Sequence, residues 1–409
     1  MLIPYLLTAS FYMLLAALMA LDAALISFEL VPMFLGIRWL RVHFITIGIV
    51  TQLIFGLLPL LVALKLHLPR PKFRLDIWLL FNVGFPVLMV GTPLMNIALM
   101  LLGGTLVFVA TSLLVWQLYQ MRADAQLTVS RQGEAGAGRK FYLMGLVYFL
   151  LGITLGTGMW MGFAQALNIH NILEVHIHAN NWGLMSLVFA GLLVDLFPRL
   201  SNRQLAWPRS VTPIFWLMSF GALGLVLGPW FNSLFFTIPG LIMHLTATIW
   251  LLLNVIVALG RDRRAWTPGL THMVAAYFWI LAPILIAPLI ILQVPGIPGA
   301  GIERNAPQAL VYGWVLQFGL PLIPYFLHTV LYPKKKGAVL GGNRWSLGLM
   351  NLGGLSLWIS IFAQEQANLF HAGAYVLWSG ALLVVLWQSW TILRGSLDRF
   401  EEIPNAFQV

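Results

Sequence analysis

Two histidines one residue apart, His176 and His178, stand at the start of an apolar stretch that runs to Phe197. On a helix, residues i and i+2 point about 200° apart, so the two imidazole rings face different neighbours. The chain contains no cysteine, which excludes thiolate-ligated metals and iron–sulfur clusters and leaves imidazole as the natural ligand for a soft metal or a heme iron. The pair can therefore serve two binding sites at once, or one site and one supporting contact.

His43 and His178 share a local pattern, with a glycine five residues after the histidine and a second glycine eight residues further on. The two histidines are 135 residues apart (178 − 43). A third copy, 130 residues after the second (308 − 178), keeps an aromatic–glycine pair at Tyr312 and Gly313 but has Gln308 in place of the histidine. The pattern predicts an internal repeat, in which glycine lets helices approach closely or leaves room for a flat ring beside a ligand.

Histidines on separate helices favour a heme over a bare metal ion. Two neutral imidazoles can hold a heme iron from both faces, whereas a zinc or copper site needs three or more converging ligands. We therefore expect His43 and His178 to ligate a heme iron. His176 then faces a second heme, a metal or a hydrogen-bond partner. His244 is a further cofactor-binding candidate because it lies deep in an apolar stretch, where a polar side chain is costly.

Two arginines, Arg38 and Arg41, come just before His43. Their guanidinium groups either pair with heme propionates or anchor the chain at the membrane interface. Of the remaining histidines, we expect His170 and His371 at the membrane interface. We expect His67, His272 and His328 in solvent near basic loops.

The composition shows which elements must position these residues. The 409 residues are 60% hydrophobic and 9% charged, with a mean hydropathy of +0.88. A soluble domain carries roughly 25% charged residues, so membrane lipid must be the main solvent. At about 20 apolar residues per span, the sequence predicts an all-α polytopic bundle of twelve transmembrane helices. They are expected at 4–28, 40–65, 76–98, 100–120, 141–164, 175–197, 211–231, 235–259, 271–293, 305–330, 345–364 and 371–393.

The basic residues sort to one side of these helices. All but Arg38, Arg41 and Arg304 of the 23 Lys and Arg residues fall on the side that also holds both termini. By the positive-inside rule both termini are cytoplasmic, in a bacterial or archaeal plasma membrane. The net charge of +10 follows from this bias and does not indicate a nucleic-acid partner. Polar breaks at 121–140 and 261–268 predict three four-helix units within one membrane domain, at about 1–130, 131–265 and 266–409.

In this plan the chain resembles the catalytic-subunit superfamily of heme–copper oxidases and nitric oxide reductases. The likeness covers the twelve helices and the three four-helix units. In motif terms it rests on Arg41-Val42-His43 opening helix 2, and on His176-Ile177-His178 followed by a helix that ends Leu196-Phe197-Pro198. The resemblance implies that His43 ligates a low-spin heme and that His178 is the nearest match to the copper ligand of helix 6.

The chain departs from the family at the copper site. In the family the His-x-His pair lies on helix 10, where this chain has Ala306 and Gln308, and the adjacent His-His of helix 7 is missing. The resemblance therefore implies a diverged relative in which a copper centre is doubtful. We expect a protein that binds heme, of b type, and acts in respiratory electron transfer or in oxygen or nitric oxide chemistry, with cytochromes or other electron-transfer subunits as partners. A twelve-helix transporter and a non-catalytic structural subunit of a respiratory complex are the alternatives.

Overall fold

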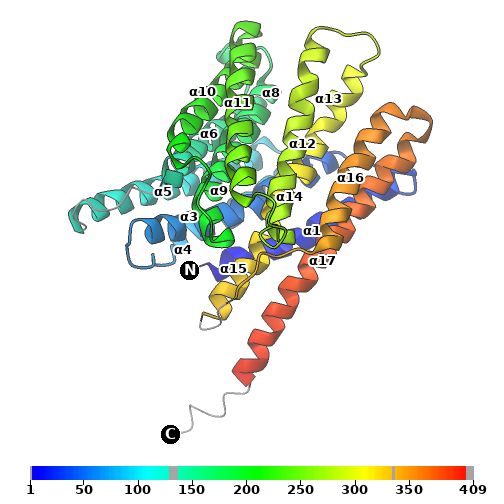
Figure 1. Cartoon of the computed structure of the whole chain (residues 1–409). Coiled ribbons are helices and arrows are strands. Elements are labelled where there is room, and N and C mark those ends of the chain that lie inside the picture. The colour runs from blue at the N-terminus through cyan, green and yellow to red at the C-terminus, as the bar shows by residue number, and fades with distance from the viewer. Residues whose placement is uncertain (1, 129–136, 334–336, 402–409) are drawn as a thin grey trace. The chain divides into compact units, whose positions relative to one another are not determined.

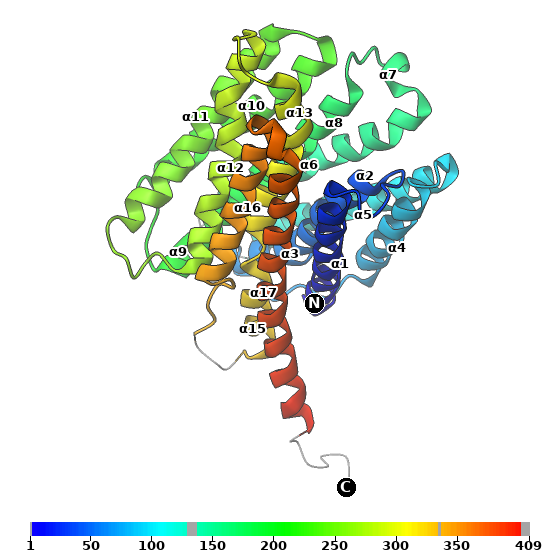
Figure 2. The ribbon, with the colours of Figure 1, turned by 90° about the vertical axis from the view of Figure 1, so that its right-hand side faces the viewer.

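The computed structural model describes residues 2–128, 137–333 and 337–401, and within these residues it contains helices and no strand (Figures 1 and 2). Segments this apolar fold as helices in lipid because each backbone N–H and C=O group then finds its partner within the same segment. The predicted all-α polytopic membrane bundle is confirmed.

Eleven helical stretches of the described chain are long and apolar enough to cross a membrane, and a shorter apolar helix makes a twelfth. Nine of the twelve spans are single helices: α1 (Ile3–Ser27), α4 (Leu75–Gly91, the shorter one), α5 (Ile97–Thr128), α6 (Ala137–Gly158), α10 (Val211–Phe231), α11 (Leu234–Leu259), α12 (Pro268–Ile291), α16 (Arg344–Phe362) and α17 (Ala367–Glu401). Short helices lie in the connections: η2 (Met159–Met161), α7 (Phe163–Ala166), η4 (Pro208–Ser210) and η6 (Gln364–Gln366).

The other three spans, the second, sixth and tenth, each contain a π-helix between α-helical parts. The second consists of α2 (Ile37–His43), η1 (Phe44–Thr51) and α3 (Gln52–Lys65). The sixth consists of α8 (Ile172–His178), η3 (Ala179–Met185) and α9 (Ser186–Ser201). The tenth consists of α13 (Gly299–Gln308), η5 (Ala309–Leu316), α14 (Gln317–Gly319) and α15 (Leu322–Leu331). These are the most deeply buried of the eleven long spans, with 83, 83 and 94% of their apolar windows buried.

Each of the twelve predicted spans corresponds to one of these stretches, but several of the predicted ends are wrong. The tenth span begins at Gly299, six residues before the predicted start, and the twelfth continues to Glu401, eight residues beyond the predicted end. The third span ends at Gly91, short of residue 98, because Met95 adopts a left-handed conformation (φ 52°) that turns the chain before α5. The fourth continues as helix to Thr128, so the polar break expected at 121–140 is helical in its first part. Residues 129–136 of that break lie outside the described residues.

The chain divides into two compact units. Unit 1 holds Ile54–Ala265, and unit 2 holds Leu2–Leu53 together with the chain from Trp266 onward. The boundary at residue 265 falls where the sequence predicts the second break. The division into three four-helix units stays a prediction.

Within unit 1, α10 packs along α11, α4 along α5, and α6 against α8, η3 and α9. Within unit 2, α17 packs along α16 and α1, while η5 contacts η1, α12 and α16. α16 and α17 lie side by side in both ribbon views (Figures 1 and 2).

The predicted repeat is present in the backbone. The π-helices η1, η3 and η5 begin directly after His43, His178 and Gln308, and the fifth residue of each is a glycine. At each glycine an added Cβ would collide with an aromatic side chain. The pairs are Gly48 with Tyr12 of α1, Gly183 with Tyr148 of α6, and Gly313 with Trp279 of α12.

The three aromatic partners come from the first, fifth and ninth spans, so each repeat presses an aromatic side chain onto the glycine of its following π-helix. Close approach is therefore a confirmed role for these glycines. The third copy has Gln308 in place of the histidine, but it has the same π-helix and the same contact between a glycine and an aromatic side chain.

Candidate functional site

The histidine pair lies where α8 ends and η3 begins. Asn171 starts α8, and its side-chain oxygen accepts the backbone N–H of Glu174 at 3.2 Å. A π-helix widens the turn locally and is frequently found at functional sites. One begins directly after His178 and another directly after His43, so both histidines are candidates for a functional role.

His176 and His178 face different helices, as their spacing predicts. The Nδ1 atom of His176 lies 2.8 Å from the carbonyl oxygen of Gly152 on α6. The Nδ1 atom of His178 lies 2.5 Å from the carbonyl oxygen of Leu225 on α10. The two rings are therefore held by two different neighbours within unit 1.

These contacts determine which ring nitrogen carries the proton. A carbonyl oxygen only accepts hydrogen bonds, so Nδ1 donates, and Nε2 is then the nitrogen with the basic lone pair. His43 follows the same rule, because its Nδ1 atom lies 2.8 Å from the carbonyl oxygen of Trp39. A backbone carbonyl on Nδ1 is the common support of histidines that bind metal through Nε2. All three histidines have it.

His178 shares an aromatic neighbour with His244 of α11. The indole of Trp182 lies 6.2 Å from the His178 ring and 5.4 Å from the His244 ring, centroid to centroid. The two histidines are close enough to interact electrostatically. We call His178, Trp182 and His244 the Trp182 cluster.

His244 is fully buried within this cluster. Its Nδ1 atom lies 3.5 Å from the hydroxyl of Thr248. The His244 ring interacts with the backbone of Trp182, and its buried Nε2 atom has no hydrogen bond of ordinary geometry. An unsatisfied buried polar atom costs about 1–3 kcal/mol, so this nitrogen is a natural place for a ligand to bind.

Helix α10 supports both histidines of the cluster from one face. Leu225 supplies the carbonyl oxygen for His178. Gly221, one turn earlier, is where an added Cβ would lie 2.6 Å from the backbone nitrogen of His244. Only a residue without a side chain lets α11 come this close, so the glycine positions His244.

In unit 2, His43 stacks on Trp39 with the ring centroids 4.0 Å apart. Arg41 is only 4% exposed, and its Nη2 atom lies 3.3 Å from Asp22 Oδ2. Its guanidinium also lies over the ring of Tyr375, 5.7 Å from the centroid. A residue this buried is not an interfacial anchor, so that interpretation is wrong for Arg41. Arg38 is exposed, as an anchor would be.

Buried tyrosines extend the Arg41 region. Tyr375 contacts Tyr312 of η5 at 5.6 Å and His371 at 5.0 Å, centroid to centroid. The Tyr312 hydroxyl is buried without a hydrogen-bond partner. His371 is half-buried, and its Nδ1 atom lies 2.6 Å from the hydroxyl of Ser27. Neither tyrosine was predicted from the sequence as a functional residue, because tyrosine in an apolar helix is usually a packing residue.

A buried carboxylate, Asp195 of α9, was not predicted from the sequence either. It is 2% exposed, the Tyr142 hydroxyl donates to its Oδ2 at 2.8 Å, and Lys65 Nζ lies 3.5 Å from its Oδ1. The residue was detectable as the one acidic residue between His178 and Phe197. It ties α9 to α6 and to the end of α3 within unit 1.

The histidines expected in solvent behave differently from one another. His67 is exposed as predicted, and so is His170, which was expected at the interface. The prediction is wrong for His272, which is fully buried with Nε2 at 2.9 Å from Ser346 Oγ. The loop before α16 covers it, since a Cβ at Gly342 would lie 2.9 Å from its ring. His328 is half-buried and stacks on Tyr332 at 5.1 Å.

Among the described residues no group of three or more His, Cys, Asp or Glu side chains gathers as a metal site would require. The structure brings His178 and His244 together in unit 1. His43 belongs to unit 2, and its sharing of one iron with His178 stays a prediction. Comparison of the sequence with known protein families and with curated proteins finds no match.

Proposed function

We propose that the protein is a heme-binding integral membrane protein of the oxidase-like superfamily, acting in respiratory electron transfer or in oxygen or nitric oxide chemistry. One observation carries the proposal. His43, His176 and His178 all hold Nδ1 on a backbone carbonyl, and His43 and His178 directly precede a π-helix. Such a carbonyl is the usual support of a histidine that ligates a metal through Nε2.

The available side chains fit a heme better than a bare metal ion. Imidazole is a common axial ligand of heme iron, and one or two imidazoles suffice. The buried Nε2 atom of His244 lacks a hydrogen bond of ordinary geometry and lies in the same cluster as His178. Covalent c-type attachment needs cysteine, and the chain has none, so a non-covalently bound heme, of b type, is proposed. Copper is not proposed, because the described residues lack a three-ligand group.

Each residue has a defined part in this proposal. His178 and His43 supply axial nitrogens, and the carbonyls of Leu225 and Trp39 hold their rings in the required tautomer. Arg38 and Arg41 offer positive charge to propionate groups. The Nε group of Arg41 has no hydrogen-bond partner. A bound heme supplies an iron that changes between two oxidation states and, when reduced, binds small gases.

Heme binding is tested on purified full-length protein by absorbance and by heme quantification. Each of His43, His178 and His244 is replaced by Ala, with His67→Ala as the matched control because His67 is exposed. We expect a Soret band in the wild type and in the control, and its loss or shift in the His43 and His178 variants. If the two histidines share one iron, each variant removes the same band. If they bind separate hemes, each removes a part.

Two other results would replace the proposal. A protein without heme that still forms a stable stoichiometric complex with respiratory subunits would be a structural subunit. A heme-free protein that carries a solute across liposome membranes would be a transporter. Cytochromes or other electron-transfer subunits that copurify with the heme-loaded protein would support the proposed role.

A further inference from the structure

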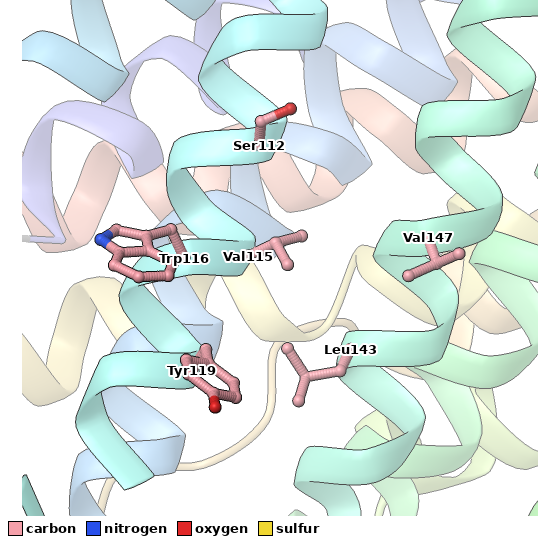
Figure 3. Close-up of a pocket in the computed structure, with 6 residues that line it drawn as sticks. All are labelled: Ser112, Val115, Trp116, Tyr119, Leu143 and Val147. Atoms are coloured by element: carbon pink, nitrogen blue, oxygen red, sulfur yellow. The ribbon is translucent and has the colours of Figure 1, made fainter. Parts of the chain in front are cut away.

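An open groove lies between α5 and α6 in unit 1 (Figure 3). Its volume is about 530 Å³, within the range of about 300–1,000 Å³ that small-molecule sites have. The groove runs along about two turns of α5, or ~10 Å. Its lining comes from both helices: Ser112, Val115, Trp116 and Tyr119 of α5, and Leu143 and Val147 of α6.

The groove exists because the two helices touch at its ends. At one end an added Cβ at Gly104 of α5 would collide with the side chain of Thr157 of α6, so the glycine lets Thr157 pack directly on the backbone of α5. At the other end Arg139 of α6 donates from Nε to the carbonyl oxygen of Leu118 on α5 at 3.3 Å. The apolar side chains between these points leave space. In Figure 3 Leu143 and Val147 approach from one helix, facing Val115 and Tyr119 of the other.

Two arginines end the groove on the same side. Arg122 follows Tyr119 by three residues on α5, and Arg139 precedes Leu143 by four residues on α6, so each continues the face that lines the groove. Arg139 interacts electrostatically with both Arg122 and Tyr119. The ion pairs of the described side chains include neither guanidinium. Two like charges therefore lie near each other at the end of an apolar groove, with Arg122 exposed and Arg139 largely buried.

The aromatic side chains complete a gradient from polar to apolar. Trp116 and Tyr119 are stacked with centroids 5.9 Å apart and are 54% and 60% exposed. Trp and Tyr rings prefer the headgroup level of a bilayer. From Arg122 toward Val147 the lining thus passes from cationic, through amphipathic rings, to aliphatic, with the Ser112 hydroxyl at the apolar end donating to the Phe108 carbonyl of its own helix. A phospholipid has the complementary order.

We propose that this groove binds an anionic phospholipid, with its phosphate at Arg122 and Arg139 and one acyl chain along Val115 and Val147. Guanidinium groups bind phosphate through paired hydrogen bonds, and basic pockets between membrane helices recognise anionic headgroups in the cytoplasmic leaflet. The phosphate separates the two arginines and offsets their repulsion. An apolar partner helix could fill the same groove but would leave the repulsion between the two arginines in place.

Lipid binding is measured by titrating delipidated full-length protein in detergent and counting bound lipids by native mass spectrometry. The probes are dioleoyl phosphatidylglycerol, which is anionic, and dioleoyl phosphatidylcholine, which carries no net charge. We expect phosphatidylglycerol to bind at least tenfold more tightly. We expect Arg122→Gln to weaken its binding by about fivefold, the usual effect of one basic residue on an anionic lipid. Arg209→Gln is the matched control, because Arg209 is exposed in unit 1 and away from the groove lining.

A second variant tests the groove itself. Val147 is 52% exposed, so Val147→Trp fills the groove without disturbing the core. It should abolish the high-affinity phosphatidylglycerol site while the arginines stay in place. Equal binding of the two lipids would overturn the proposal. So would equal losses in Arg122→Gln and Arg209→Gln, full binding by Val147→Trp, or a copurifying protein that occupies the groove in place of lipid.

Discussion

Replacement of Gly313 by Ala should destabilise the protein because the facing ring cannot move. The added Cβ would lie 2.6 Å from Trp279 Cγ, whereas carbon atoms pack at about 3.5–4.0 Å. The Trp279 ring is held on its far side as well, because a Cβ at Gly354 would lie 2.5 Å from it. The indole Nε1 also donates to Asn351 Oδ1 at 3.0 Å. The ring would have to shift by about 1 Å between two fixed neighbours.

The expected cost follows from two opposing terms. Overpacking a well-packed site costs about 1–3 kcal/mol, and the rigid ring places Gly313→Ala near 3. Replacing glycine by alanine within a helix stabilises the helix by about 1 kcal/mol. The net loss of unfolding free energy is therefore about 2 kcal/mol.

The assay is reversible unfolding in mixed lipid–detergent micelles, followed by circular dichroism. Gly348→Ala is the control, because Gly348 lies in α16 and an added Cβ there would meet no atom within 4 Å. The control should gain about 0.5–1 kcal/mol. If Gly313→Ala is as stable as the wild type, or gains as much as the control, the tight contact between η5 and α12 is refuted.

Two further predictions concern the buried carboxylate and the topology. Asp195→Asn should lose about 1–2 kcal/mol of unfolding free energy in the same assay, because it removes a charge paired with Lys65. Lys65 is partly exposed, so solvent reduces the cost. Asp76→Asn, in the exposed pair with Arg74, should change the unfolding free energy by less than about 0.5 kcal/mol, and equal effects of the two substitutions would refute the special role of Asp195. Because the chain has no cysteine, single-cysteine variants report topology directly. In intact cells a membrane-impermeant maleimide should label Val294→Cys, and it should label Arg263→Cys only after the cells are permeabilised. The reverse result would place the termini outside the cell.

The spans were predictable because lipid imposes a simple rule. A segment that must hide its backbone forms a helix, so α1 at Ile3–Ser27 lies within one residue of the predicted 4–28. The π-helices were not predictable as such. A uniformly apolar helix has no periodicity that separates i→i+5 from i→i+4 hydrogen bonding. The glycine spacing predicted a repeat, and the π-helices coincide with it, since Gly48, Gly183 and Gly313 are the fifth residues of η1, η3 and η5.

The candidate site was predictable in part. The spacing of His176 and His178 correctly implied two different neighbours. Their partners, the carbonyls of Gly152 and Leu225, could not be inferred, because backbone carbonyls leave no trace in a sequence. His272 was misplaced for a related reason: its position near a helix end suggested solvent, but the loop before α16 covers it.

Heme binding is tested most directly by the visible spectrum of purified full-length protein, oxidised and reduced, for the wild type, His43→Ala and His178→Ala. We expect a Soret band and reduced-state bands of a b-type heme in the wild type. Each variant should lose or shift them while its helical content, measured by circular dichroism, stays unchanged. A wild-type protein without a Soret band after supplementation with heme would contradict the proposed function, and so would two variants with wild-type spectra.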